Sequence, residues 1–141
     1  MTYLLDTTVL VYAAGDEHAL RESAQDLVRS VGANRFRATT TPEVIQEFTH
    51  VHARRHGRQS AVDRARDFLQ LLSPLTVVVE DDMRRALEVF LTHDRVGSFD
   101  AVLAAVALER QELELITADR AFEDIVALPV LHLGDEHHRW R

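Results

Sequence analysis

Two periodic patterns alternate along the chain, and their alternation predicts an α/β fold. Short apolar runs bounded by turn or capping residues indicate strands. These runs are Tyr3–Leu5, Phe36–Thr39, Leu75–Val79, Leu113–Thr117 and Val130–Leu133. Between them, apolar residues recur at the three- and four-residue spacing of helices. The helical segments lie near Leu20–Val31, Glu43–His56, Val62–Leu72, Met83–Thr92 and Phe99–Arg110.

Strands that alternate with helices favour a mostly parallel sheet, because parallel neighbours need crossover connections. We therefore expect a central sheet of about five strands flanked by helices on both faces. The chain has 141 residues and no repeat or linker rich in Pro, Gly or Ser, so residues 1–141 are expected to form a single domain. Thr41 with Pro42, Asp81 or Asp82, and Ser98 are candidate helix starts.

Composition excludes several function classes. The chain contains no Cys, which rules out disulfides, thiolate zinc sites and cysteine nucleophiles. All 16 basic residues are Arg, so a Walker phosphate loop and Schiff-base lysine chemistry are also ruled out. A net charge of −7 argues against a protein coated in nucleic acid, although local basic patches are compatible with it.

The longest apolar run, Ala101–Leu108, is far shorter than the ~20 residues that cross a bilayer. The N-terminus reaches Asp6 without the basic start and apolar middle of a signal peptide. These features predict a protein of the cytoplasm with no membrane partner.

Two acids directly follow predicted strands, where ligands bind in open α/β sheets. Asp6 follows the first strand and Asp119 follows the fourth. Each residue alone is also a good helix N-cap, and both roles stay open.

Asp100 opens a segment whose next eight residues, Ala101–Leu108, are all apolar. A helix that is apolar all round is buried, and an unpaired buried carboxylate costs several kcal/mol. The helix dipole returns only about 0.3–1 kcal/mol, and no cation lies one turn away. The alternatives are a dipole-compensating acid and a carboxylate balanced by a distant Arg or a metal.

The helix after Pro42 carries Glu43 and Glu47. On a helical wheel Glu47 lies at the edge of the apolar face, whereas Glu43 lies farther round, as a surface acid of the first turn would. Convergence of Asp6, Glu47, Asp100 and Asp119 would raise their pKa values unless a divalent cation joined them. Oxygen ligands alone select a hard ion such as Mg²⁺ or Mn²⁺, which suits phosphoryl chemistry with a metal-activated water.

Four motifs in this order resemble the PIN-domain nucleases, and within them the VapC-like toxins of bacterial toxin–antitoxin pairs. The motifs are Leu5–Leu10, Pro42–Phe48, Ser98–Ala105 and Thr117–Phe122, and the likeness runs the length of the chain. The resemblance implies a single PIN-like domain and a Mg²⁺- or Mn²⁺-dependent endoribonuclease that cleaves tRNA or rRNA.

The same resemblance implies roles for individual residues. Asp6, Glu47, Asp100 and Asp119 would form the acidic catalytic pocket, with Asp6, Asp100 and Asp119 as metal ligands. Thr7 and Thr117 would orient the metal or its waters. The resemblance also implies a homodimer and a cognate antitoxin whose tail blocks the pocket. Many relatives carry a further acid where this chain has Ala121, which argues against a second tightly held metal.

A nuclease of net negative charge needs a local positive surface for RNA phosphates. The stretch His50–Arg66 supplies one, and Arg54, Arg55 and Arg58 are the candidate substrate contacts. A solvated, basic helix end is the alternative interpretation. The pairs His52 with His56 and His137 with His138 are weaker candidates for a transition metal, since each lacks a third ligand.

Competing functions are weaker. A haloacid-dehalogenase-like phosphatase needs a second Asp at the position of Thr8 and a Lys, and a receiver domain also needs a Lys. The remaining alternative is a non-catalytic PIN-like scaffold that binds RNA or a protein without cutting.

Overall fold

A computed structural model describes residues 1–135 and residue 140. Its centre is a sheet of four parallel strands in the order β2–β1–β3–β4. These strands are β1 (Thr2–Leu5), β2 (Ala38–Thr39), β3 (Leu113–Thr117) and β4 (Val130–His132). Four of the predicted strands are thus confirmed, at slightly different bounds.

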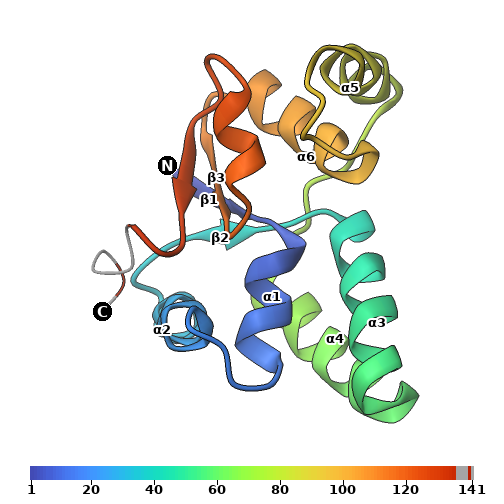
Figure 1. Ribbon diagram of the computed structural model, residues 1–141. Helices are drawn as coiled ribbons and strands as arrows, with labels where there is room; N and C mark the ends of the chain where they lie inside the picture. Colours follow the sequence, from blue (N-terminus) through green and yellow to red (C-terminus); the bar gives the residue numbers. More distant parts are fainter. Residues whose placement is uncertain (136–139, 141) are drawn as a thin grey trace.

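Six α-helices and a short 3₁₀ helix, η1, fill the connections in the described part of the chain. They are α1 (Thr7–Ala14), α2 (Arg21–Gly32), α3 (Pro42–His56), α4 (Arg58–Leu72), α5 (Glu80–Thr92), α6 (Ser98–Glu109) and η1 (Arg120–Asp124). In Figure 1, α1 and α2 lie on one side of the sheet and α5 and α6 on the other. The predicted three-layer α/β architecture is confirmed.

The predicted strand Leu75–Val79 is wrong. The segment is extended and runs past the β2 edge, where the Thr76 amide donates to the Thr40 carbonyl at 2.9 Å. The carbonyl of Val77 instead accepts from the Arg110 guanidinium at 3.1 Å. A single backbone contact to the sheet does not make a strand, so the sheet has four strands where about five were predicted.

Helix α1 was not predicted from the sequence pattern. Its eight residues, TTVLVYAA, are apolar on nearly every side, so they carry no three- and four-residue alternation of apolar and polar positions. Asp6 begins this helix by accepting a hydrogen bond from the Thr7 amide at 2.8 Å. The chain therefore turns from strand to helix immediately at the first candidate acid.

The helix starts were predicted with partial success. Thr41 caps α3 through the Val44 amide, as expected. The helix through Met83 begins after Val79, and Asp82 reaches back from inside it to the Val79 amide. Helix α6 begins after Gly97, with Ser98 as its first residue.

The core lies between the sheet and the helices, and the predicted buried helix α6 is at its centre. Six of the twelve α6 residues are buried, among them Ala104, Ala105 and Val106, which have no exposed surface. Trp140 is also buried, and its indole packs edge-on to the ring of Tyr3 with centroids 6.3 Å apart. Trp140 therefore packs against the domain.

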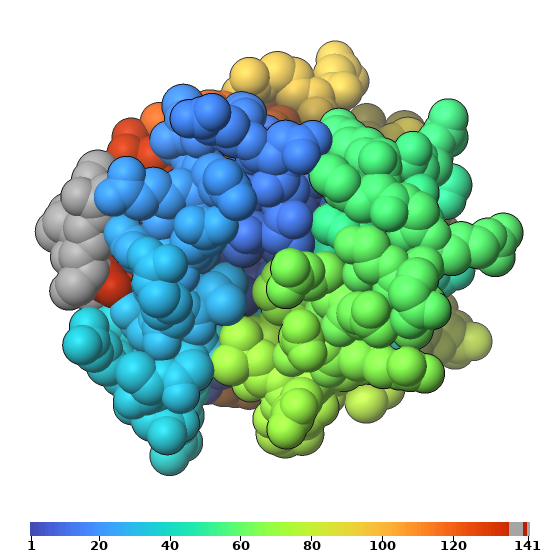
Figure 2. Space-filling model, turned by 90° about the horizontal axis from the view of Figure 1, so that it is seen from below, coloured from blue at the N-terminus to red at the C-terminus, as the bar shows by residue number. Residues whose placement is uncertain are grey.

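A hollow of about 390 Å³ opens between α2 and α4, with the end of α1 contributing to its wall. Figure 2 shows it from below, bordered by the blue and cyan surface of α1 and α2 and by the green surface of α4. Within the described part of the chain, no helix combines the length and apolar character needed to cross a membrane.

Candidate active site

Asp6 lies where β1 ends, beside the end of β3. These strands are parallel neighbours in a register that pairs Leu5 with Ile116, so their carboxyl ends meet at one edge. The Thr117 hydroxyl donates to Asp6 Oδ2 at 2.7 Å, and the Thr8 hydroxyl donates to the same oxygen at 2.8 Å. With the Thr7 amide on Oδ1, three donors hold this buried carboxylate in one orientation.

Burial dominates the electrostatics of Asp6. It raises the pKa of Asp6 above its ordinary value, and the nearby charge of Glu47 raises it further. The hydrogen bonds from Thr117, Thr8 and Thr7 act in the opposite direction, because they stabilise the ionised form.

Asp119 follows β3 and is tied to Asp6 through two threonine hydroxyls. Its amide donates to Thr117 Oγ1 at 2.9 Å, and the Ala118 amide donates to Thr8 Oγ1 at 3.0 Å. The Asp119 carboxylate caps η1 by accepting from the Ala121 amide at 2.9 Å. Both acids that follow strands are therefore helix caps as well as members of one connected group.

Asp100 lies in the first turn of α6, at the entrance to the core. No residue that the structure describes donates a hydrogen bond to its carboxylate, and no Arg among them pairs with it. Burial raises its pKa to about 7, with further contributions from the charges of Asp6, Asp119 and Glu47. The four acids predicted from the sequence are thus close enough to act on one another electrostatically.

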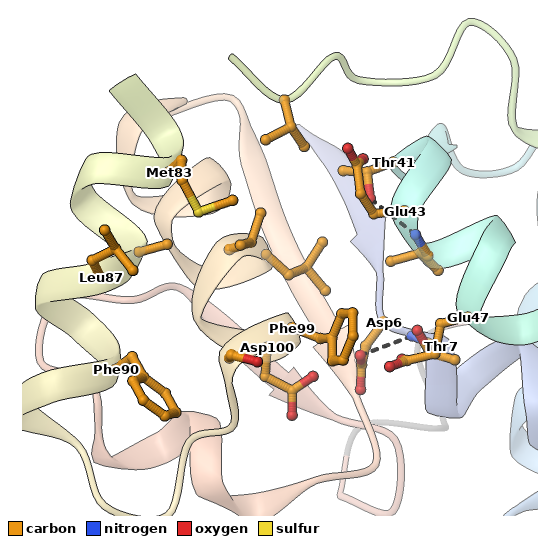
Figure 3. A pocket seen from close by; sticks show the side chains of 16 residues that line it. Asp6, Thr7, Thr41, Glu43, Glu47, Met83, Leu87, Phe90, Phe99 and Asp100 are labelled. Atoms are coloured by element: carbon orange, nitrogen blue, oxygen red, sulfur yellow. Dashed lines mark hydrogen bonds between the residues drawn. The ribbon is translucent and has the colours of Figure 1, made fainter. Parts of the chain in front are cut away.

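Glu47 comes from the second turn of α3 and is half-buried, whereas Glu43 is exposed. Glu47, Asp6 and Asp100 line two adjoining hollows, one of about 330 Å³ and one of about 360 Å³. Glu43 lines only the more apolar hollow of about 330 Å³, and Asp119 lines neither. Figure 3 shows Asp6, Thr7 and Glu47 on one side of this region and Asp100 on the other.

The acids surround the hollow without closing into a compact cage. Among the described residues, no three His, Cys, Asp or Glu side chains are close enough to hold one ion directly. Oxygen donors of this kind still fit Mg²⁺, which is usually bound through one or two carboxylates and keeps several waters.

The basic stretch of the sequence divides between two faces. Arg55 lines the hollow that contains Asp6, Glu47 and Asp100. Arg54 and Arg58 line a separate hollow, together with Thr49 and His50. Adjacent residues on α3 point about 100° apart, which is why sequence proximity did not place these three Arg side chains together.

In the candidate His52–His56 metal pair, His52 is a packing residue. His52 is buried, its ring stacks on Phe48, and its Nε2 lies 3.0 Å from Ser60 Oγ. Burial lowers the pKa of His52, and the neighbouring charges of His56 and Arg64 lower it further. His137 and His138 lie outside the described residues.

Comparison with known proteins agrees with this arrangement. Residues 3–128 match the family model described as PIN domain. This chain is a PIN-domain protein. It is 46% identical over 123 residues to Ribonuclease VapC7 of Mycobacterium tuberculosis, which covers 86% of this chain and 85% of the relative. The resemblance and the ribonuclease class predicted from the sequence are thereby confirmed.

Solved structures of other proteins share the fold. The VapBC2 complex of Rickettsia felis, bound to a DNA fragment from its promoter, gives a TM-score of 0.71 at 18% identity and covers 94% of this chain and 98% of its own. VapC20 of Mycobacterium tuberculosis, a sarcin-ricin loop cleaving toxin, gives 0.67 at 21% identity and covers 86% and 93%.

Two features of this PIN-domain site were missed from the sequence. Thr8 bonds Asp6 and Ala118, and Phe99 stands exposed beside the acids. The Asp-Thr-Thr sequence after a strand is a signal that could have identified Thr8, since an Asp that caps a helix lies close to the donors of its first turn. Phe99 had no such signal, because its exposure depends on how α5 and α6 pack.

Proposed function

We propose that this PIN-domain protein is a metal-dependent endoribonuclease, the toxin of a toxin–antitoxin pair, which hydrolyses phosphodiester bonds of tRNA or rRNA. The observation that carries the proposal is a group of four electrostatically coupled carboxylates from four elements, three of which line one hollow, with no Arg among the described residues paired to Asp100. Such a group is costly unless a cation balances it. The 46% identity to Ribonuclease VapC7 supports the same activity.

Asp6, Asp100 and Asp119 are the proposed groups that would hold a Mg²⁺ or Mn²⁺ ion, directly or through its bound waters, and Glu47 would bind the metal or orient water. When bound, the metal neutralises charge on the phosphate and lowers the pKa of a water molecule. The chain's own residues supply orientation. Thr117 and Thr8 fix the Oδ2 atom of Asp6, and Thr7, which lines the hollow, fixes Oδ1 through its amide.

Asp100 has a second role in this proposal. Its pKa of about 7 belongs to the metal-free site, where burial and three neighbouring acids oppose its charge. A bound cation would favour the ionised carboxylate, so Asp100 would couple metal binding to the release of a proton. Arg55 contacts the RNA backbone beside the acids, whereas Arg54 of α3 and Arg58, the first residue of α4, contact it at a separate hollow.

Two protein partners complete the proposal. The solved relatives include VapBC complexes, and we assign the hollow between α2 and α4 to an antitoxin segment. Its apolar floor is formed by Val28, Phe68 and Leu71, and Arg21, Arg29 and Arg64 lie on its rim. A second copy of the chain covers the exposed apolar face of α5. We expect the protein to act in the cytoplasm, where RNA and an antitoxin are available.

Cleavage of total cellular RNA by the purified protein tests the proposed activity. With Mg²⁺ or Mn²⁺ we expect discrete fragments that disappear with EDTA and with Asp100→Asn. Asp81→Asn is the matched control, because it removes an exposed carboxylate on α5 that lines neither hollow. RNA binding without cleavage by the folded, antitoxin-free protein would instead support the non-catalytic scaffold.

A further inference from the structure

The hollow of about 360 Å³ beside the acids has walls that extend beyond the acids themselves. Val51 and Arg55 continue the face of α3 that begins with Glu47, since the three residues are spaced by four. Gly97 and Phe99 form the opposite wall, at the start of α6. The hollow therefore extends from the acids along α3.

Phe99 is the exposed aromatic ring of this hollow. Its side chain is 71% exposed, and Figure 3 shows the ring beside the carboxylates of Asp6 and Asp100. Tyr12 also lines the hollow, but one face of its ring already stacks on His18, with centroids 4.1 Å apart and planes 8° from parallel. Phe99 has no aromatic partner among the described residues, so its face is free to stack on a ligand.

Arg55 is the one basic residue among those that line the two acid-containing hollows. It forms no ion pair with any residue that the structure describes. Eight residues separate it from Glu47, which is about 12 Å along the helix axis. A phosphate against Arg55 would thus flank the phosphate held at the acids.

We infer that this hollow binds nucleotides next to the scissile phosphate of single-stranded RNA, with one base stacked on Phe99 and a flanking phosphate against Arg55. The inference deepens the proposed function and depends on it. Unpaired bases stack on aromatic side chains, and a guanidinium is a good partner for phosphate.

The charge pattern favours RNA over a peptide for this hollow. Arg55, which forms no ion pair with a described residue, attracts anions, and so do the acids once they hold a metal. A nucleic acid strand presents phosphates at regular intervals. A basic peptide suited to the acids would meet the like charge of Arg55, and an acidic peptide would lack bases to stack on Phe99. An RNA strand can place a phosphate against Arg55 and a base on Phe99 at the same time.

The test uses a short single-stranded RNA that contains a mapped cleavage site, and a series with one abasic nucleotide at each flanking position. Binding is measured by fluorescence anisotropy in the Asp100→Asn background, so the RNA is not cut. We expect Phe99→Leu to weaken binding about tenfold, in line with the loss of one stacked base, and Phe99→Tyr to retain it. An abasic nucleotide at one flanking position should weaken binding to the Asp100→Asn parent by the same factor. The same abasic RNA should bind the Phe99→Leu variant no more weakly than the intact RNA does.

Arg55→Gln should reduce the slope of log affinity against log salt by about 0.7, the value for one phosphate contact on a single strand. Arg37→Gln is the matched control, because it removes an exposed Arg that precedes β2, at the end of the sheet opposite Asp6, and lines neither acid-containing hollow, so its slope should not change.

Three results would overturn the inference in distinguishable ways. RNA binding that is independent of Phe99 and Arg55, while the parent still cleaves RNA, contradicts the inference alone. If these variants instead weaken only capture of the co-expressed antitoxin, the hollow is a protein site. If the unmodified chain neither binds nor cleaves RNA, the proposed function itself fails.

Discussion

Thr117 donates a hydrogen bond to Asp6 Oδ2 at 2.7 Å, and this contact joins the ends of two neighbouring strands at the candidate active site. The hydroxyl is buried and also accepts from the Asp119 amide at 2.9 Å. One side chain thus orients two of the four acids.

Thr117→Val is expected to remove both contacts while keeping the side-chain shape. A buried carboxylate and a buried amide would each lose a partner, so the free energy of unfolding should fall by about 1–3 kcal/mol. The affinity for Mn²⁺, followed by the rise in melting temperature with added ion, should fall as well. Thr117→Ser keeps the hydroxyl and should behave like the parent in both measurements. Unchanged Mn²⁺ affinity in Thr117→Val would show that Thr117 does not contribute to metal binding.

Asp100 should make the stability of the metal-free protein fall as the pH rises. Its folded pKa of about 7 lies above its ordinary value of 3.8, so the folded state binds this proton more tightly than the unfolded state. The stabilisation is complete below about pH 4 and is lost as the pH rises through about 7. Urea denaturation in EDTA measures this stabilisation as the difference in unfolding free energy between the parent and Asp100→Asn. A difference that does not vary over this pH range would contradict the raised pKa.

Two ion pairs that join α5 to α6 should differ in their contribution to stability because they differ in burial. Arg110 makes two hydrogen bonds of 3.0 Å to the buried Asp82, whereas Arg85 lies 2.7 Å from Glu109 at the surface. Arg110→Met leaves an uncompensated buried carboxylate and should cost about 3–5 kcal/mol of unfolding free energy. Arg85→Met should cost about 0–1 kcal/mol. Equal losses in chemical denaturation would be inconsistent with this view.

The contribution of Arg110 to the free energy of unfolding should also depend on pH. Hydrogen bonding to Arg110 lowers the pKa of Asp82, despite the opposing effect of burial. Because the folded pKa is lower than the unfolded one, this stabilisation is present above the unfolded value and is lost as the pH falls through the folded pKa. The difference in unfolding free energy between the parent and Arg110→Met should therefore shrink in acid.

The exposed apolar face of α5 should control the proposed homodimer. Met83, Leu87 and Phe90 lie on one side of this helix and are 45%, 61% and 49% exposed. Leu87→Arg should convert a dimer to a monomer in sedimentation velocity without lowering the melting temperature of the monomer. Val126→Arg changes an isolated residue that is 88% exposed and should leave the dimer intact. A dimer that persists in Leu87→Arg would place the interface elsewhere.

The local sequence pattern was sufficient to predict much of the fold and to identify the candidate acids. Strand and helix periodicities depend on neighbours within one turn or one strand, so β1, β3 and helices α2 to α6 could be predicted near their observed bounds. The buried character of α6 followed from its uninterrupted apolar run, which made Asp100 stand out. Asp6 and Asp119 were recognisable because parallel strands end on the same side of a sheet.

Other features depended on contacts between distant segments. Leu75–Val79 has the composition of a strand, but strand formation needs a ladder of backbone partners, and the Val77 carbonyl is bonded by Arg110 instead. Helix α1 was hidden because it is buried on almost every side, which removes the alternation that marks a helix. The Thr117–Asp6 bond joins residues that are 111 positions apart, and the exposure of Phe99 depends on how α5 and α6 pack. Residue types and local periodicity therefore specified which groups are available, and tertiary packing decided which of them share a hollow.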